Sequence, residues 1–245
     1  MAPFVDGAAW VDETNFSIAF VSYYTWGSAI GLALDLALRD LTSGRVTLDD
    51  YMRAMWREHG SPGDAAPGLV SRPYTPRDAQ DRLAAVSGDP EFAGAFFAKY
   101  IEGHEVVDYE RLLSRAGLVL RRRYPGRAWL GGVSFDPHAQ GVRIAALVGP
   151  SSPAYAAGLE KDDVIVSLGG REMASAQDVS GVLEARKPGE TLRVRFLRRG
   201  EPVTGTIVLA EHPELELLAM EQTGGMPTPA QREFRQSWLR TRTEN

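Results

Sequence analysis

The 245-residue sequence contains no cysteine, which excludes disulfide bonds, thiol catalysis and zinc sites built on thiolate ligands. It also lacks an excess of basic residues, because 27 Lys and Arg stand against 32 Asp and Glu and give a net charge of -5. That balance argues against a nucleic-acid partner. The first 16 residues lack the basic and apolar regions of a secretory signal peptide. We expect a soluble chain, and its localisation stays open.

One uncharged run, Phe16 to Leu34, has 19 residues and therefore meets the length of a membrane-spanning helix. Six serine, threonine and tyrosine residues dilute this run, and Asp35 follows it directly. Because a carboxylate is costly to place in a bilayer, we reject a membrane span and expect the central helix of a soluble core. Within that helix Asp35 and Arg39 stand four residues apart and are expected to pair.

The rest of the first half predicts a series of helices. Four residues of the kind that cap helix N-termini precede helical patterns: Thr47, Thr75, Asp89 and Asp108. Each of the two threonines is followed three residues later by an aspartate, as in a capping box. An apolar stripe in the first of these helices is expected in the core: Leu48, Tyr51, Met52, Met55 and Trp56. The segment 61–68 reads as a loop.

The second half has the pattern of a small β-rich α+β domain. Short segments rich in β-branched residues and bounded by Gly, Pro or Asp predict five strands, within 127–136, 141–150, 162–170, 191–200 and 203–211. Two short helices are expected between them, the second capped by Ser175. Before this domain, "RRRYPGR" at 121–127 is interpreted as a helix C-terminus and a solvated linker. After it come a Pro-containing linker and an amphipathic helix with Phe234 and Trp238 on one face.

"SPAYAAGLEKDDVIVSLGG" (152–170) and the segments around it resemble a PDZ domain of the bacterial type, over residues 128 to 210. The resemblance implies that an extended peptide adds as a strand beside Val133 to Phe135, over a groove floored by the helix at 177–186. The family's carboxylate-binding loop falls on "WLGG", where glycines free backbone N–H groups. This chain has Gly132 where the family usually has a bulky apolar residue. The peptide-binding residues so implied are Trp129, Leu130, Gly131, Gly132, Val133, Phe135, Val179 and Leu183. Alternatively, this domain only packs against its neighbour.

The order of segments along the whole chain resembles a second family. "FVSYYTWGSAIGLALDLALRDLTSG", "YTPRDAQDRLAAVSG", "FFAKYIEGHEVVDYERLLSRAGL", the PDZ-like segment and "TPAQREFRQSWL" follow one another. That order is similar to the C-terminal portion of PDZ-bearing, glycyl-aminopeptidase-like zinc peptidases of the gluzincin group. "PFVDGAAWVDETN" near the start also fits.

The chemistry that this resemblance implies depends on zinc held by an HExxH helix and a later glutamate. A tyrosine three residues before a glycine donates a hydrogen bond to the oxyanion in that family, and the matching residue here is Tyr24, before Gly27. Tyr23 is expected to point elsewhere, since neighbours on a helix lie about 100° apart. None of the four histidines stands in an HExxH motif. We therefore predict no metal site and no cofactor in this chain, with zinc in the complete family enzyme.

Two hypotheses follow. The chain begins where the family is already past its zinc helix, so it reads as a C-terminal fragment of a zinc aminopeptidase, inactive alone, with a separate zinc-binding half as a partner. It can instead be a stand-alone PDZ-containing protein that binds peptide or protein segments. The predicted fold is an α-helical subdomain (1–124), a PDZ domain (128–211), and a linker with a C-terminal helix (212–245).

Overall fold

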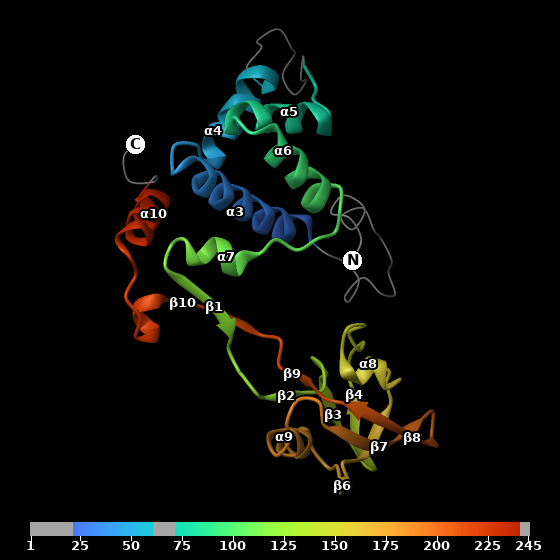
Figure 1. The fold of residues 1–245 in the computed structure, drawn as a ribbon. Helices are drawn as coiled ribbons and strands as arrows, with labels where there is room; N and C mark the ends of the chain where they lie inside the picture. The colour runs from blue at the N-terminus through green and yellow to red at the C-terminus, as the bar shows by residue number, and fades with distance from the viewer. Residues whose placement is uncertain (1–21, 61–71, 241–245) are drawn as a thin grey trace. The chain divides into compact units, whose positions relative to one another are not determined.

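The computed structural model describes residues 22–60 and 72–240 (Figure 1). The N-terminal segment that contributes to the family resemblance and the loop predicted at 61–68 lie outside the described residues. The predicted order of a helical part, a β-rich α+β domain and a C-terminal helix is confirmed.

The chain forms two compact units. The described part of the first unit lies within 22–121 and 217–240 and is mainly helical. The second unit covers 122–216 and is mainly β-sheet. Within the described residues, the chain passes from one unit to the other at two places. The boundaries predicted from the sequence, 1–124 and 128–211, remain a prediction.

The helices of the first unit begin where the sequence signals indicate. They are α3 (Tyr23–Thr42), α4 (Leu48–Met55), α5 (Pro76–Ser87), α6 (Pro90–Phe96), α7 (Tyr109–Ser114) and α10 (Pro229–Arg240). Single π-helical turns, η1 (Trp56–Gly60) and η2 (Phe97–Ile101), extend α4 and α6, and a 3₁₀ turn, η3 (Met220–Thr223), follows the last strand. Thr47 and Thr75 form complete capping boxes, while Asp89 and Asp108 each accept one backbone N–H. All four predicted caps are confirmed.

Helix α3 is the central helix of the first unit because it is buried on two faces. Ile30, Leu34 and Leu38 join an apolar cluster with side chains of α4, α5 and α6. Ala33 and Leu36 join a second cluster, with side chains of α7, α10 and the strand β1 (Leu118–Arg122). The prediction of a central buried helix is therefore confirmed. Among the described residues, no helix is both long and apolar enough to cross a membrane.

The apolar stripe predicted on α4 is only partly buried. Tyr51 and Met55 are each 9% exposed, but Met52 is 56% and Trp56 is 61% exposed. Helix α4 packs with one narrow face against α3 and α5. Met52 lies about 100° around the helix from Tyr51, and the change to a π-helical turn at Trp56 breaks the helical repeat. The burial expected for Met52 and Trp56 is therefore wrong.

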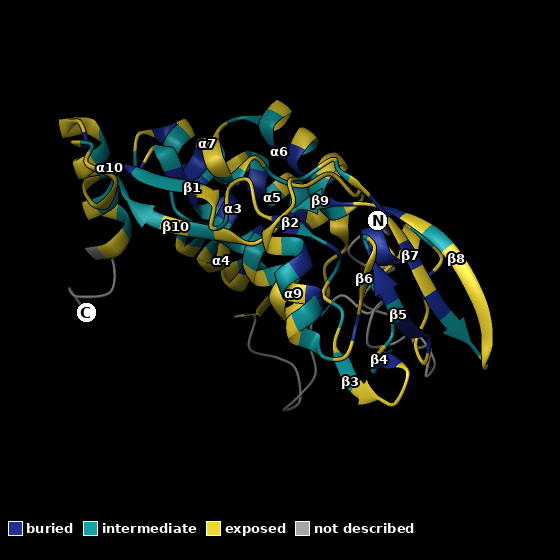
Figure 2. Cartoon of the chain, turned by 90° about the horizontal axis from the view of Figure 1, so that it is seen from below, coloured by how far each residue is buried: buried dark blue, intermediate teal, exposed yellow. Residues whose placement is uncertain are grey.

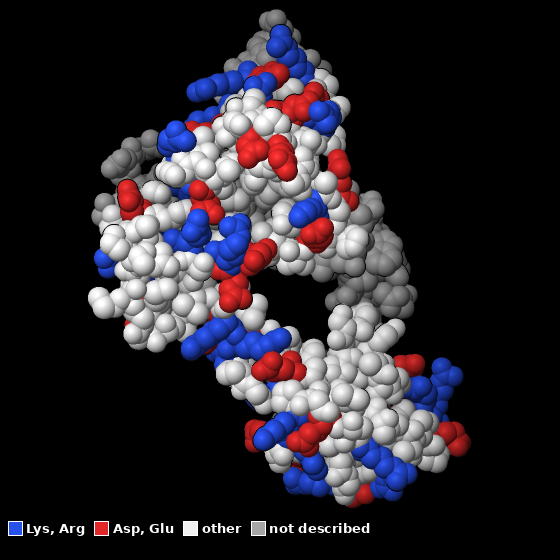
Figure 3. Space-filling view, in the orientation of Figure 1, with Lys and Arg blue, Asp and Glu red and all other residues white. Residues whose placement is uncertain are grey.

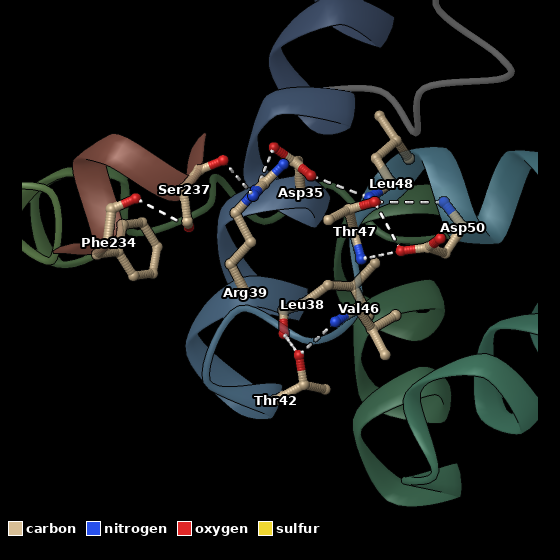
Figure 4. Close-up of polar contacts among 10 residues, drawn as sticks. All are labelled: Asp35, Leu38, Arg39, Thr42, Val46, Thr47, Leu48, Asp50, Phe234 and Ser237. Atoms are coloured by element: carbon tan, nitrogen blue, oxygen red, sulfur yellow. Dashed lines mark hydrogen bonds and ion pairs between the residues drawn. The ribbon is translucent and has the colours of Figure 1, made fainter. Parts of the chain in front are cut away.

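A buried ion pair connects three helices of the first unit (Figure 4). Arg39 Nε donates to Asp35 Oδ2 over 2.9 Å, as the sequence predicts, and the two side chains are only 5% and 14% exposed. Asp35 Oδ1 also accepts the backbone N–H of Leu48 at the start of α4 (2.9 Å). Arg39 Nη1 donates to the carbonyl oxygen of Ser237 in α10 (3.2 Å). The pair thus fixes the start of α4 and the position of α10 against α3.

Helix α10 closes the first unit by satisfying backbone carbonyls at the end of α7. Phe234 and Trp238 pack against the second apolar cluster, which confirms the predicted amphipathic helix. Arg235 donates to the carbonyl oxygens of Ala116 (2.6 Å) and Gly117 (2.7 Å). The carbonyls that a helix end leaves unpaired therefore find their partners on α10.

The interpretation of residues 121–127 as a helix end is wrong. Helix α7 ends at Ser114, and residues 118–122 form strand β1, which pairs with β10 (Leu215–Ala219). Arg122 pairs with Glu211 (2.9 Å), and Arg123 pairs with Glu214. These partners lie about ninety residues along the chain, so the local sequence holds no sign of the pairing.

The second unit is a six-stranded antiparallel sheet with two helices. Its strands are β3 (Phe135–His138), β4 (Gly141–Ile144), β5 (Val164–Leu168), β7 (Thr191–Arg198) and β8 (Glu201–Val208), in that order, with β6 (Arg171–Glu172) beside β5. A separate pair joins β2 (Ala128–Trp129) to β9 (Ala210–Glu211). The helices are α8 (Pro153–Ala156) and α9 (Ala176–Glu184), the latter capped by Ser175 as predicted. Figure 2 shows β5 buried inside the sheet and β8 largely exposed at one edge.

A second buried carboxylate holds the second unit together. Asp163 is 2% exposed and accepts two hydrogen bonds from Arg198, at 3.0 Å from Nε and 2.7 Å from Nη2. It also accepts the backbone N–H of Glu160 (2.8 Å). The hydrogen bonds to Asp163 raise the pKa of Arg198 above its ordinary value. The turn before β5 is therefore fixed to the end of β7.

We predict that Asp35→Ala destabilises the first unit by about 3–5 kcal/mol, because it leaves the Arg39 guanidinium buried without its carboxylate. The control is Asp81→Ala, which removes an ion pair of the same spacing with Arg77, where both side chains are exposed. That change should cost at most about 0.5 kcal/mol. Urea unfolding followed by far-UV circular dichroism measures both, and similar losses in the two variants would contradict the prediction.

Candidate functional site

Strand β3 forms one edge of the six-stranded sheet. It pairs with β4 on one side, from Phe135 opposite Ile144 to His138 opposite Gly141. The pairing extends one residue further, because Ala145 donates its N–H to the carbonyl of Ser134 (2.9 Å). No described strand pairs with the other side of β3. An edge strand of this kind has free backbone groups that a further strand can pair with.

The free side of β3 runs beside helix α9, and apolar side chains lie between them. Val133, Phe135 and Leu183 are partly buried and pack against the core of the second unit. We call these three residues the β3–α9 strip. Beneath it, Leu130 and Val179 are each 2% exposed and belong to the core itself. The structure thus brings together five of the eight residues that the sequence implied.

Trp129 lies apart from this group. Its neighbours Ala128 and Leu130 are buried in the core, so the alternation along β2 turns Trp129 to the other side. The Trp129 ring lies 6.3 Å from the ring of His212, which in turn packs edge-on against Tyr124 at 4.9 Å. The indole therefore supports the pairing of β2 with β9 and does not extend the β3–α9 strip.

The two glycines of the loop have different surroundings. Gly131 has φ +137°, and a Cβ built there would lie 2.9 Å from the Cβ of Ser152. Only glycine fits this position. Gly132 has a negative φ, and a Cβ built there meets no atom within 4 Å. The next residue, Val133, packs against the core of the second unit.

The loop presents unused backbone donors. Within the described part of the chain, the N–H groups of Gly131, Gly132 and Val133 have no protein acceptor. The loop is nevertheless fixed, because the carbonyl of Leu130 accepts the N–H of Ala154 in α8 (2.8 Å). Three consecutive donors beside a free strand edge can bind a carboxylate. The sequence did not indicate that Ser152 and Ala154 contact this loop, although Ser152-Pro153 is a recognisable helix start.

Tyr24 lies in the first turn of α3 and is 74% exposed. Tyr23 does not point elsewhere as expected, because the two rings lie with centroids 4.2 Å apart at 33°. The neighbouring Tyr24 hydroxyl, and to a lesser degree desolvation, raise the pKa of Tyr23 above its ordinary value. Trp26, in the same turn, packs against the core of the first unit. The phenol of Tyr24 is therefore available to a binding partner.

The described residues do not fit a zinc ion. Among them, no three His, Asp or Glu side chains are grouped so as to hold a metal. His59 Nδ1 lies 3.0 Å from the carbonyl oxygen of Arg72, and His212 is engaged with aromatic rings. Any zinc chemistry near Tyr24 would need ligands from outside the described residues.

A cavity of 590 Å³ in the first unit lies between the end of α3, the end of α7 and α10. Its charged lining includes Arg39 and Arg115, which pair with Asp35 and with Asp40, respectively. Because these guanidinium groups already have carboxylate partners, we assign the cavity no ligand.

On the surface, basic and acidic side chains are interspersed over the face of the molecule that Figure 3 shows.

Residues 131–209 match the family model described as "PDZ domain", and the fold agrees. The chain is 38% identical over 66 residues to "Serine protease HTRA1" of Xenopus tropicalis, covering 27% of this chain and 14% of that protein. It is 35% identical over 68 residues to "Serine protease Do-like HtrA" of Bacillus subtilis (strain 168), covering 27% and 15%. The second unit thus contains a PDZ domain.

One solved structure is similar over most of the chain. It is described as an aminopeptidase N family protein from Idiomarina loihiensis, with 24% identity and a TM-score of 0.54. The similarity covers 86% of this chain and 37% of that one, so this chain spans little more than a third of its neighbour. At this identity the likeness shows the fold alone.

We predict that Gly131→Ala destabilises the PDZ domain by about 1–3 kcal/mol, because alanine is strained at this φ and its Cβ would meet Ser152. Gly132→Ala is the matched control, and its cost should stay within about 0.5 kcal/mol because its Cβ enters open space. Hydrogen exchange of peptides from 128–211 measures both. Equal protection in the two variants would show that the loop is not constrained as described.

Proposed function

We propose that the PDZ domain binds the C-terminal segment of an extended peptide. The observation that carries this proposal is the outer edge of β3, which has no strand partner among the described residues and is preceded by three consecutive N–H groups without an acceptor in that part of the chain. The peptide adds as a strand beside β3, and its terminal carboxylate accepts hydrogen bonds from Gly131, Gly132 and Val133. Its alternate side chains rest on the β3–α9 strip, which selects apolar residues.

We further propose that the chain acts as the C-terminal part of a zinc aminopeptidase. The HExxH helix would then come from another segment of the same polypeptide or from a separate chain. The ordered motifs and the fold likeness over 86% of the chain support this proposal. In it, the exposed phenol of Tyr24 donates a hydrogen bond to the oxyanion that forms on the scissile carbonyl. The PDZ domain presents peptide to the enzyme.

The second candidate is a stand-alone adaptor that binds peptide and catalyses nothing. It is favoured by the lack of a metal-binding group among the described residues. It is also favoured by the second unit's own apolar core, which consists of residues of that unit alone. The two candidates share the peptide site and differ in whether Tyr24 takes part in chemistry.

We predict that a fluorescein-labelled decapeptide with three apolar C-terminal residues binds the chain with a Kd on the order of 1–100 μM. Amidation of its C-terminus should weaken binding about tenfold or more, because the charge-assisted hydrogen bonds to the loop are lost. Fluorescence anisotropy measures both peptides. Equal affinity of the acid and the amide would rule out carboxylate recognition.

Leu183→Ala should weaken binding of the same peptide about tenfold by removing part of the β3–α9 strip. Thr204→Ala is the control, because Thr204 is exposed on β8, at the opposite edge of the sheet. Circular dichroism of both variants confirms folding. Unchanged affinity in folded Leu183→Ala would place the peptide elsewhere.

We predict that the chain alone, with added zinc, releases no amino acid from aminoacyl p-nitroanilides. Addition of an HExxH-bearing segment from a full-length relative should restore release. In that assembly Tyr24→Phe should lower kcat roughly 10²–10³-fold, as for the loss of one oxyanion donor. Tyr74→Phe, an exposed tyrosine outside α3, is the control. Zinc-dependent release by the chain alone, or full activity of Tyr24→Phe, would overturn this proposal.

A further inference from the structure

Strand β3 has a proline, Pro137, at its third position, and this residue is exposed. Proline carries no backbone N–H, so a strand lacks one hydrogen-bond donor wherever proline stands. The consequence depends on the side to which the backbone of that residue points. Toward β4 the loss would weaken the sheet itself, whereas at the outer edge it would limit what a further strand can bind.

One hydrogen bond between β3 and β4 fixes this direction. In an antiparallel pair, residues that exchange hydrogen bonds with the neighbouring strand alternate with residues whose N–H and C=O point away from it. Phe135 lies opposite Ile144, so Ser134 lies opposite Ala145 when the register is extended by one residue. Ala145 donates its N–H to the carbonyl of Ser134 over 2.9 Å. Ser134 therefore faces β4.

The alternation sorts the other residues of the strand. Asp136 and His138 follow Ser134 at intervals of two and also face β4. The residues between them face the outer edge, where no described strand pairs: Val133, Phe135 and Pro137. The missing donor of Pro137 therefore leaves the pairing with β4 intact and is lost from the edge that the proposed peptide uses.

This register is well fixed, which matters because a slip by one residue would reverse the two sets. Arg143 Nη2 donates to Asp136 Oδ2 over 2.6 Å, and these residues lie directly opposite each other on β4 and β3. At the turn between the strands, Gly141 has φ +151°, and a Cβ there would run into the carbonyl oxygen of Ile165. Only glycine fits that position, so the turn cannot move along the chain.

The proposed peptide then has a definite register on β3. Its carboxylate lies at the loop before the strand, so it runs antiparallel to β3. Because Val133 donates its N–H to that carboxylate, the last residue of the peptide lies opposite Val133. The third residue from the end then lies opposite Phe135, and the fifth lies opposite Pro137.

We propose that Pro137 sets the length of peptide that the site reads through its backbone. Val133 and Phe135 can each exchange two hydrogen bonds with the residue opposite, but Pro137 can only accept one. The carbonyl of the fifth residue from the peptide's end therefore finds no donor on the strand. Full backbone pairing covers the last four residues and ends there. This inference rests on the proposed peptide site.

A proline on an edge strand also hinders pairing between two copies of a chain. That role alone predicts that Pro137→Ala self-associates, as measured by size-exclusion chromatography, and reads peptides of the same length as before. A role in peptide length predicts a changed preference at protein concentrations where the variant is monomeric. The two roles therefore differ in a measurable way.

The test is competition with the fluorescein-labelled decapeptide for the full chain, followed by fluorescence anisotropy. Both unlabelled competitors contain the three C-terminal residues of the decapeptide. One is this tripeptide with an N-terminal acetyl group, and the other has one alanine between the tripeptide and the acetyl group. Only the longer competitor carries a carbonyl at the fifth position, so the ratio of the two affinities reports on that carbonyl and one small side chain.

Pro137→Ala supplies the missing N–H, so this ratio should shift about 2–10-fold in favour of the longer competitor, the effect of one hydrogen bond. Pro202→Ala is the matched control, because Pro202 is an exposed proline on β8, at the opposite edge of the same sheet. It should keep the wild-type ratio. Circular dichroism confirms folding, and Pro137→Val restores the same donor as a second variant.

An unchanged ratio in folded Pro137→Ala, while the decapeptide acid still binds more tightly than its amide, would overturn the role of Pro137 and leave the peptide site standing. Equal binding of acid and amide would instead remove the carboxylate anchor, and the register on Pro137 falls with it. Hydrogen exchange followed by NMR in the wild type tests the register without any variant. Peptide binding should protect the N–H of Phe135 at least tenfold, and an unprotected N–H there would contradict the proposal.

Discussion

The ion pair between Asp35 and Arg39 is the interaction on which the helical unit depends. Two opposite charges are buried in the central helix, and each is also bonded to the backbone of another helix, at Leu48 and Ser237. A buried carboxylate or guanidinium left without these partners is strongly unfavourable. The start of α4 and the docking of α10 are therefore coupled to α3. Although α10 lies almost two hundred residues after α3, it is an integral part of the same unit.

The second unit uses the same principle with different elements. Asp163 and Arg198 join the turn before β5 to the end of β7, and the core fills the space between the sheet and the helices. Among the described residues, the outer edge of β3 and the glycine loop before it have no backbone partner. The proposed peptide site is therefore built from backbone groups that the fold does not use itself. In the proposal, selectivity comes from the few partly buried side chains beside that edge.

The two units divide the proposed function between them. The PDZ domain offers backbone donors and an apolar strip, which recognise a peptide without chemistry. The helical unit offers an exposed pair of phenols, which can stabilise negative charge but cannot activate water by themselves. Among the described residues, neither unit has a group of side chains that could hold a zinc ion.

Much of the fold could be predicted from the sequence because its signals are local. The caps at Thr47 and Thr75, and the spacing of Asp35 and Arg39, depend on residues three or four apart. The strands of the second unit were marked by β-branched segments between turns. For the candidate site, the glycine loop and the residues of the β3–α9 strip were inferred through the resemblance to PDZ domains and not from local signals. Trp129 was misplaced, because alternation along a two-residue strand shows only once its partner strand is known.

What the sequence by itself determined is the kind and order of most elements, β1 and β10 excepted, since capping, periodicity and turn residues act over a few positions. Only the tertiary structure decided which faces of those elements are covered. The exposure of Met52 and Trp56, the pairing of β1 with β10 and the contact of Tyr23 with Tyr24 all belong to this second class. The first two depend on neighbours distant in sequence, and the third on side-chain rotations within one helical turn. No short-range sequence pattern encodes the distant neighbours or these side-chain rotations.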